Sequence, residues 1–445
     1  MQNFLYETIL NTTNRGRRLV GPRWINPAHF GVDTPDRETN RAFAQFQDEL
    51  ESRLSLPFGL KLMKSRWLQS TEEDGASSAI EASLAAHFIK WYDPDFALKI
   101  IEPFFDNQSS EGIIPSAVMP LSISSKPASP FIAEVILRLS RLSHSNKLAD
   151  HFERLEHFSN WLILHKKESD GMFIHADKEW FAEDPYIHHI RSERPDVMRT
   201  PHDVRSVALN SMMVFQMQCM AQMARALKLD KEARRHEESA KQLRDIIAAK
   251  LWNEEKGFFF DSVGDAQVQT ASLMGFLPLA ADVPTKGQAA RMAGYLPQML
   301  DRLNILIQQP GVAPIFLLVA DGLGKYGYRK EASSLAFASV NYIRSLGKAK
   351  KYFLPRLVAK LLLVRNIIGF HQFDDRYVLN PCLPDEWKNG PVGIRVARNS
   401  HIIYMTLKDS QKVECSILSS AGEQVSTTID NYAFKNFPFP IESIK

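Results

Sequence analysis

The stretch DRYVLNPCLPDEW, residues 375–387, marks a change in the character of the chain. It joins a strand-like run at residues 377–379 to a turn at Asn380-Pro381. Before this stretch apolar residues recur mostly at helical spacing, whereas after Gly369 they recur with a period of two. The stretch therefore predicts a boundary between a long helical part and a small C-terminal β-subdomain.

Helical periodicity dominates the chain before this boundary. In residues 39–54, Phe43, Phe46 and Leu50 fall on one face at i, i+3 and i+7. Ser129 and Asp203 stand where N-caps of two further helices are expected. The same spacing predicts helices over residues 77–92, 95–108, 129–143, 148–167, 203–229, 230–252, 285–300, 315–328, 329–346 and 355–368.

The connections between these helices alternate in length. Asp93-Pro94 and Gly327-Tyr328 are very short breaks, which imply antiparallel hairpins. The longer loops would then gather at the opposite end, where functional sites are common. Repeated hairpins that close on themselves make a toroid, so we expect a mainly α fold of this kind.

The chain after the boundary predicts antiparallel strands. Period-two patterns cover residues 392–399, 401–409, 413–420 and 423–430. We expect an N-terminal extension over residues 1–38, a helical barrel over 39–370 and a C-terminal β-subdomain over 371–445.

Composition excludes several functional classes. The chain has 445 residues and a net charge of +3, which predicts no strong electrostatic attraction to nucleic acid. The three cysteines are too far apart for a metal or redox motif, and they favour a reducing, cytoplasmic setting. The apolar run at 357–370 contains Lys360 and Arg365, so we expect no membrane span. The oligomeric state stays open.

Four stretches in order resemble a known family: residues 91–115, 207–261, 319–336 and 377–387. The chain is similar to six-hairpin (α/α)-barrel glycosidases, most of all to bacterial relatives of processing α-glucosidase in glycoside hydrolase family 63, mannosylglycerate hydrolases and trehalases. The resemblance covers most of residues 40–390. It implies an (α/α)6 toroid of helical hairpins with a small C-terminal antiparallel β-subdomain.

The resemblance also implies a reaction, the inverting hydrolysis of an α-glucosidic or α-mannosidic bond in a small saccharide or glycoside. One carboxylic acid protonates the leaving oxygen, and a second carboxylate activates water on the opposite face. The two groups lie roughly 6.5–9.5 Å apart in such enzymes. No cofactor is implied.

The loop SRWLQSTEEDGASS, residues 65–78, corresponds to a loop that binds the non-reducing sugar in the family. The resemblance implies that Trp67 serves as the sugar platform and that Glu73 or Asp74 replaces the family's aspartate. The alternative is a solvated turn that caps the following helix.

The loop at residues 170–196 corresponds to the segment that carries the family's general acid. Trp180 is followed by Phe-Ala-Glu-Asp-Pro, so Asp184 is the first candidate for the acid, with Glu183 and Asp196 behind it. The family's glycine is missing and the spacing is shorter. The alternative is a polar surface loop.

The same loop contains further side chains suited to a sugar, namely Tyr186 and His188. His188 and His189 are adjacent, and neighbouring histidines point apart on a helix and lack the spacing of metal ligands. We therefore expect no metal here.

The general base cannot be placed. The connection GKAKKYFLPRL, residues 347–357, contains no carboxylate and has Lys348, Lys350 and Lys351 instead. An ammonium group cannot accept a proton from water near neutral pH unless it is strongly desolvated. Two hypotheses remain, a glycosidase whose base has moved, and a catalytically degenerate barrel that binds a carbohydrate or supports a partner enzyme. A lyase or epimerase on the same scaffold is a third.

Overall fold

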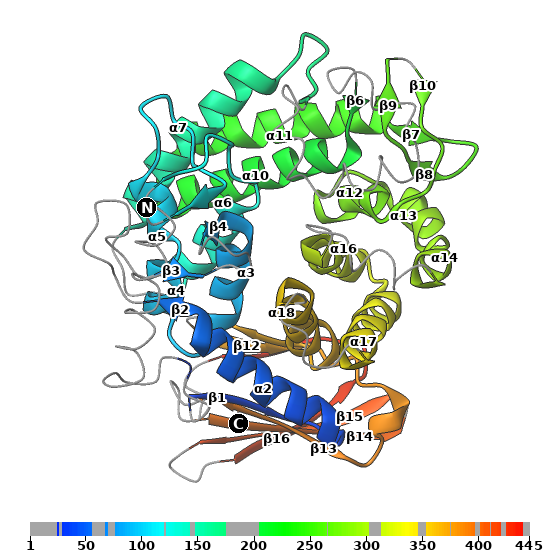
Figure 1. Cartoon of the computed structure of the whole chain (residues 1–445). Coiled ribbons are helices and arrows are strands. Elements are labelled where there is room, and N and C mark those ends of the chain that lie inside the picture. Colours follow the sequence, from blue (N-terminus) through cyan, green and yellow to red (C-terminus); the bar gives the residue numbers. More distant parts are fainter. Residues whose placement is uncertain are drawn as a thin grey trace.

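The computed structural model describes the chain over the following residues: 25, 29–55, 67–69, 76–119, 122–142, 147–174, 204–264, 266–301, 313–345, 353–373, 375–396, 401–409, 411–419 and 424–438. Helices arranged around a common centre precede a β-sheet at the end of the chain (Figure 1). None of the described helices is both long and apolar enough to cross a membrane.

An inner set of helices surrounds the centre of the molecule (Figure 1). Their residues are buried on most sides, as the run of apolar residues in each predicts. Each contacts the next in chain order, and the last packs back against the first. The set is α3 (Ala79–Ile89), α6 (Ile132–Ser140), α10 (Val207–Ala226), α12 (Leu277–Ala280), α16 (Ala313–Lys325) and α18 (Phe353–Leu362).

An outer set lies outside the inner one, and its long helices bury only one stripe each (Figure 1). In α11, for example, Ala233, Ala240 and Ile247 are buried at heptad spacing while most charged residues between them face solvent. The outer helices are α2 (Arg37–Arg53), α4 (Pro94–Lys99), α5 (Glu102–Asp106), α7 (Leu148–Lys166), α11 (Asp230–Lys250), α13 (Lys286–Ala293), α14 (Leu296–Asp301) and α17 (Arg329–Ser345).

The connections differ at the two ends of the inner helices. Short turns leave their C-terminal ends, as at residues 90–93, 227–229 and 326–328. In the first of these turns the Asp93 carboxylate accepts the Phe96 N–H at 2.9 Å and caps α4. The segments that enter the N-terminal ends are longer, which confirms the predicted alternation of loop lengths.

Some predicted helix ends were wrong. The helix expected over 129–143 begins only at Ile132, so Ser129 is not its N-cap. Asp203 lies outside the described residues, and α10 is capped instead by Ser206, whose Oγ accepts the Leu209 N–H at 3.0 Å. The predicted helix over 95–108 is interrupted at residues 100–101 and forms α4 and α5, in agreement with the kink expected at Pro103, which lies in the first turn of α5.

The four predicted C-terminal strands are all present in one antiparallel sheet. They are β13 (Pro391–Val396), β14 (His401–Asp409), β15 (Lys412–Ser419) and β16 (Gln424–Asp430), paired in this order. A fifth strand, β1 (Phe30–Asp33), comes from the N-terminal region and pairs with β13. The Phe30 ring stacks on Trp91 with ring centroids 5.1 Å apart, so β1 connects the sheet to the helices.

The boundary stretch forms strand β12 (Arg376–Leu379), between β11 (Phe370–Gln372) and β17 (Lys435–Pro438). Gly369 directly precedes β11 and has a φ of +75°, and an added Cβ would collide with the Asn380 carbonyl group. Only glycine suits this backbone.

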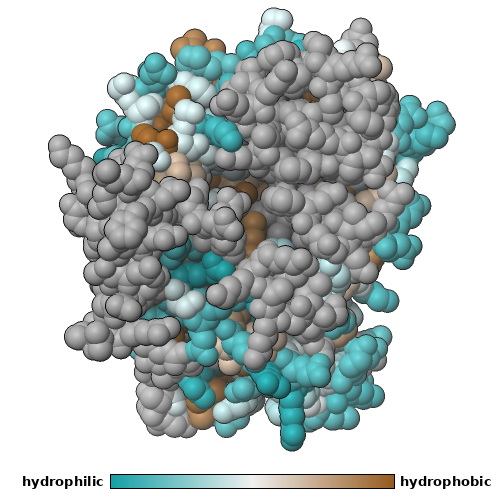
Figure 2. Space-filling model, viewed as in Figure 1, coloured by the Kyte–Doolittle hydropathy of each residue, from teal (hydrophilic) through white to brown (hydrophobic). Residues whose placement is uncertain are grey.

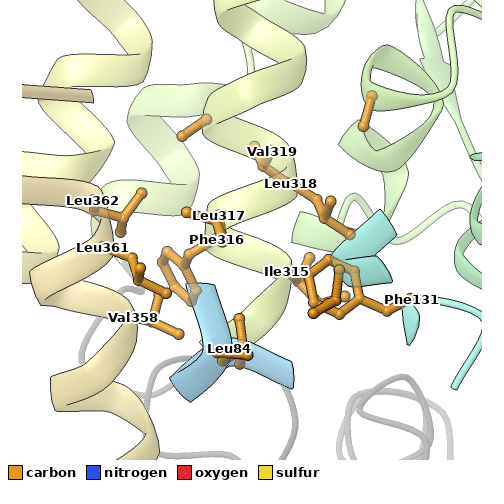
Figure 3. Packing of buried hydrophobic residues seen from close by; sticks show 14 of the residues in the cluster. Leu84, Phe131, Ile315, Phe316, Leu317, Leu318, Val319, Val358, Leu361 and Leu362 are labelled. Atoms are coloured by element: carbon orange, nitrogen blue, oxygen red, sulfur yellow. The ribbon is translucent and has the colours of Figure 1, made fainter. Parts of the chain in front are cut away.

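Apolar side chains fill the centre of the ring of inner helices. Leu84 of α3, Ile315 and Phe316 of α16, and Val358 and Leu361 of α18 converge there (Figure 3). In the space-filling view, hydrophobic atoms are visible at the bottom of a hollow near the middle of the molecule (Figure 2). We call the side chains of Leu84, Ile315, Phe316, Val358 and Leu361 the apolar layer.

Candidate functional site

Among the residues predicted to form the carbohydrate site, the structure describes Trp67. It lies in strand β3 (Trp67–Leu68), which pairs with β2 (Leu54–Ser55), and its side chain is buried with 2% of its surface exposed. Its indole N–H has no hydrogen-bond partner among the described residues. The other predicted site residues lie outside the described residues: Glu73, Asp74, Trp180, Glu183, Asp184, Tyr186, His188, Asp196 and the three lysines at 348, 350 and 351.

The described residues line a polar cavity of ≈ 560 Å³. It lies near the short turns of the ring, whereas Trp67 lies in the segment that enters the N-terminal end of α3. The lining of this cavity comes from the ends of α3 and α16, from residues 134–142 in and after α6, and from residues 215–222 of α10. The outer helix α11 and strand β11 complete the wall. This cavity was not predicted, and Trp67 is not part of its lining.

Glu134 of α6 is the central acid of this region. Its carboxylate contacts Arg138 one turn further along the helix, and its Oε2 lies 2.6 Å from His87 Nε2 of α3. Burial alone would raise the pKa of Glu134, but the charges of Arg138 and Arg365 and the contact with His87 hold this pKa well below its ordinary value. Glu134 is therefore ionised at neutral pH.

His87 is fully buried between α3 and α6. Burial lowers its pKa to about 4, because the loss of hydration outweighs the attraction of Glu134. The imidazole is thus neutral near pH 7.

Arg365 and Asp321 form a second ion pair beside the first. Arg365 lies on a π-helical turn (Leu363–Ile367) that continues α18, and its guanidinium contacts the Asp321 carboxylate of α16. Arg138 lies 3.9 Å from the same carboxylate, measured from Nη2 to Oδ2. The Arg365 Nε has no hydrogen-bond partner among the described residues.

Lys90 follows the last residue of α3 and is 8% exposed. Within the described part of the chain its ammonium group has no ion pair, and it lies over the Trp91 ring, whose centroid is 5.9 Å away. Burial and the positive charges of Arg138 and Arg365 hold the pKa of Lys90 well below its usual range.

The ionised state of Glu134 does not suit the role of general acid in glycoside cleavage. A general acid must be protonated near neutral pH, whereas Glu134 is held ionised by its cationic neighbours. The sequence indicates this cavity only through charged residues that interrupt apolar helices. Glu134 and Arg138 interrupt an apolar helix at i, i+4, and Arg365 interrupts the apolar run of the last helix.

Comparison with known proteins gives a family match. The model of the family described as mannosylglycerate hydrolase MGH1-like glycoside hydrolase domain matches residues 77–302, about half of the chain. The comparison with curated protein sequences found no match.

Solved structures share the fold. An uncharacterized conserved protein from Thermus thermophilus is 16% identical and has a TM-score of 0.57, with 73% of this chain and 100% of that chain covered. The family 63 mannosylglycerate hydrolase of the same organism, in complex with glucose, is 16% identical with a TM-score of 0.55, and 72% and 99% are covered. A family 78 rhamnosidase from Bacillus sp. GL1 is 12% identical with a TM-score of 0.59, covering 89% of this chain and 42% of that chain.

Proposed function

Because the chain belongs to the mannosylglycerate hydrolase MGH1-like glycoside hydrolase family, we propose that it hydrolyses an α-glucosidic or α-mannosidic bond in a small saccharide or glycoside with inversion. The family match over residues 77–302 is the observation that carries this proposal. It covers the inner helices α3, α6, α10 and α12 and the long segments that enter them.

The proposed fold is a closed (α/α)6 barrel over residues 39–370, with an N-terminal extension over 1–38 and a β-subdomain over 371–445. The contacts of the inner helices in cyclic order, with α18 against α3, support closure. Strand β1 of the extension belongs to the C-terminal sheet, so the two ends of the chain join one unit.

The proposed sugar site lies at the N-terminal ends of the inner helices. The segment that contains Asp184 runs between α7 and α10, and the segment that contains Trp67 runs between α2 and α3. Both therefore enter inner helices from the same end of the ring. The apolar layer would form the floor of such a site and separate it from the polar cavity.

In the proposed reaction the Asp184 carboxyl group protonates the oxygen of the leaving group. A second carboxylate removes a proton from water as that water attacks the anomeric carbon from the opposite face. Glu183 and Asp196 are the other acid candidates in the same segment. Trp67, Trp180, Tyr186 and His188 would hold the sugar, with Glu73 or Asp74 bonded to its hydroxyl groups.

The second candidate function is a degenerate barrel that binds a carbohydrate or supports a partner enzyme. The observation in its favour is the connection at 347–357, where the family's base is expected and three lysines stand instead of a carboxylate.

Activity assays separate the two candidates. The wild-type protein is assayed on glucosylglycerate, mannosylglycerate, trehalose and aryl α-glucosides, beside Asp184→Asn, Glu183→Gln and Asp196→Asn. Loss of a positioned general acid lowers the rate on the order of 10²–10⁴. We expect that loss in Asp184→Asn alone, with sugar binding retained. A wild-type protein that binds sugar but turns over no substrate would support the degenerate barrel.

A further inference from the structure

The polar cavity carries more positive than negative side chains. Its lining includes six cations, namely Lys90, Arg138, Arg141, Arg244, Lys325 and Arg365. Three acids line it as well, namely Glu134, Glu237 and Asp282. Clusters of arginine and lysine in a sheltered cavity attract anions, because the low dielectric strengthens each charge interaction.

The acids of the lining already have partners. Glu134 contacts Arg138, and Asp282 Oδ2 lies 3.0 Å from Lys325 Nζ. Glu237 forms an ion pair with Arg225, in which Nη2 and Oε1 are 2.7 Å apart. Arg225 is not part of the lining. No acid of the described lining is thus left to neutralise the remaining cations.

Three cations of the lining have no ion pair within the described residues. Lys90 is buried, Arg244 is half-buried and Arg141 is exposed. Arg141 donates to Gln222 Oε1 at 2.9 Å, which leaves its charge uncompensated. The three come from different elements, so their charges approach the cavity from different sides.

Lys90 gives the strongest indication that an anion binds in this cavity. An isolated buried ammonium group costs several kcal/mol of hydration unless it is paired, so its pKa falls when no anion is near. The lowered pKa of Lys90 reports such a loss of hydration together with repulsion from Arg138 and Arg365. Arg365 lines the same cavity, and its positive charge contributes to the lowered pKa of Lys90.

We propose that this cavity binds a small phosphate-bearing anion, at the end of the barrel opposite the proposed sugar site. Its phosphate group takes hydrogen bonds from Lys90 and Arg365, while Arg141 and Arg244 hold it from the entrance. A tetrahedral dianion suits donors that approach from several directions. The cavity, at ≈ 560 Å³, has room for a small organic group attached to the phosphate.

The test uses the full-length protein and measures binding by calorimetry and thermal unfolding at constant ionic strength. Inorganic phosphate is compared with chloride, and glycerol 3-phosphate is compared with glycerol, which separates free phosphate from a phosphomonoester. A specific anion that binds the folded state raises the melting temperature with its concentration. We expect both phosphate probes to do so, and chloride and glycerol to have no such effect.

Two variants and a matched control locate the binding. Lys90→Met and Arg244→Gln should each weaken phosphate binding about tenfold, since each removes a charged donor. Lys90→Met should melt no lower than wild type without phosphate, because it removes an unpaired buried amine. Lys241→Gln, on the same helix as Arg244 but outside the lining and largely exposed, should bind as wild type does.

Three results would overturn the proposal. Chloride could stabilise the protein as much as phosphate does, Lys90→Met and Arg244→Gln could bind phosphate normally, or Lys241→Gln could lose binding equally. None of these readouts uses sugar turnover, so an inactive glycosidase site leaves the test intact.

Discussion

Glu134 Oε2 and His87 Nε2 lie 2.6 Å apart between the inner helices α6 and α3, with side chains that are 5% and 0% exposed. The contact joins two neighbouring helices of the ring at the edge of the polar cavity. Because Glu134 also contacts Arg138, one buried carboxylate connects a neutral imidazole and a guanidinium.

Removing the charge of Glu134 should strongly destabilise the fold. Glu134→Gln removes the carboxylate that contacts Arg138 and leaves Arg138 and Arg365 to share Asp321. Breaking a buried ion pair costs about 3–5 kcal/mol. Denaturant unfolding measures the change. The control is Asp245→Asn, which removes the partner of Lys241 at the same i, i+4 spacing on an exposed surface and should change stability by less than about 0.5 kcal/mol. Equal effects of the two substitutions would contradict the role given to the buried pair.

Stability should fall as pH drops from about 6.5 to about 4. His151 of α7 is buried against the Phe105 ring, with ring centroids 4.8 Å apart, and burial lowers its pKa to about 4. The unfolded chain takes up the proton near pH 6.5 while the folded protein does not, so acid favours unfolding in this window and the stabilisation is complete above it.

The size of this effect follows from the shift. The lowered pKa of His151 reduces the free energy of unfolding by about 3 kcal/mol once the pH is below 4. The pKa of His87 is also lowered by burial, so its protonation destabilises the fold in the same pH range. His151→Phe should flatten the dependence of the unfolding free energy on pH between 6.5 and 4. Parallel curves for the variant and the wild type would show that His151 is not the source.

The glycine at the junction between helices and sheet should not tolerate a side chain. Gly369→Ala forces a residue with a Cβ into a positive φ and against the Asn380 carbonyl group, at a cost of at least about 2 kcal/mol. Gly324→Ala provides the comparison, since Gly324 lies within α16 and an added Cβ meets no atom within 4 Å. Gly324→Ala should raise the free energy of unfolding by about 0.5–1 kcal/mol. If Gly369→Ala were as stable as wild type in thermal unfolding, the described junction would be wrong.

Trp67 should affect stability as well as sugar binding. Its side chain is buried, so Trp67→Ala should cost about 3–5 kcal/mol in denaturant unfolding. Sugar affinity, measured at a temperature where the variant is folded, should also fall if Trp67 supplies a stacking face. A folded variant with unchanged sugar affinity would assign Trp67 to the core alone.

Sequence patterns predicted the regular elements well because each pattern is local. Strand β14 matches the predicted range of residues 401–409, and the hairpin of α10 and α11 was predicted to within a few residues. Strand β1 was missed because four residues show too little alternation, and its partner β13 lies far away in sequence. Its pairing depends on tertiary contacts that no local pattern encodes.

The polar cavity was missed for a related reason. Lys90 follows α3, Arg138 lies on α6 and Arg365 lies on the turn that continues α18, and no short motif connects them. The predicted sugar site rests on the family resemblance, and the structure describes one of its residues, Trp67.

The most direct test of the proposed function follows the anomer released from an α-linked substrate by proton NMR. Inverting hydrolysis of glucosylglycerate or mannosylglycerate should yield the β-anomer of the free sugar first, before mutarotation mixes the two forms. Release of the α-anomer first, or no release of sugar by a folded protein that binds the substrate, would contradict the account.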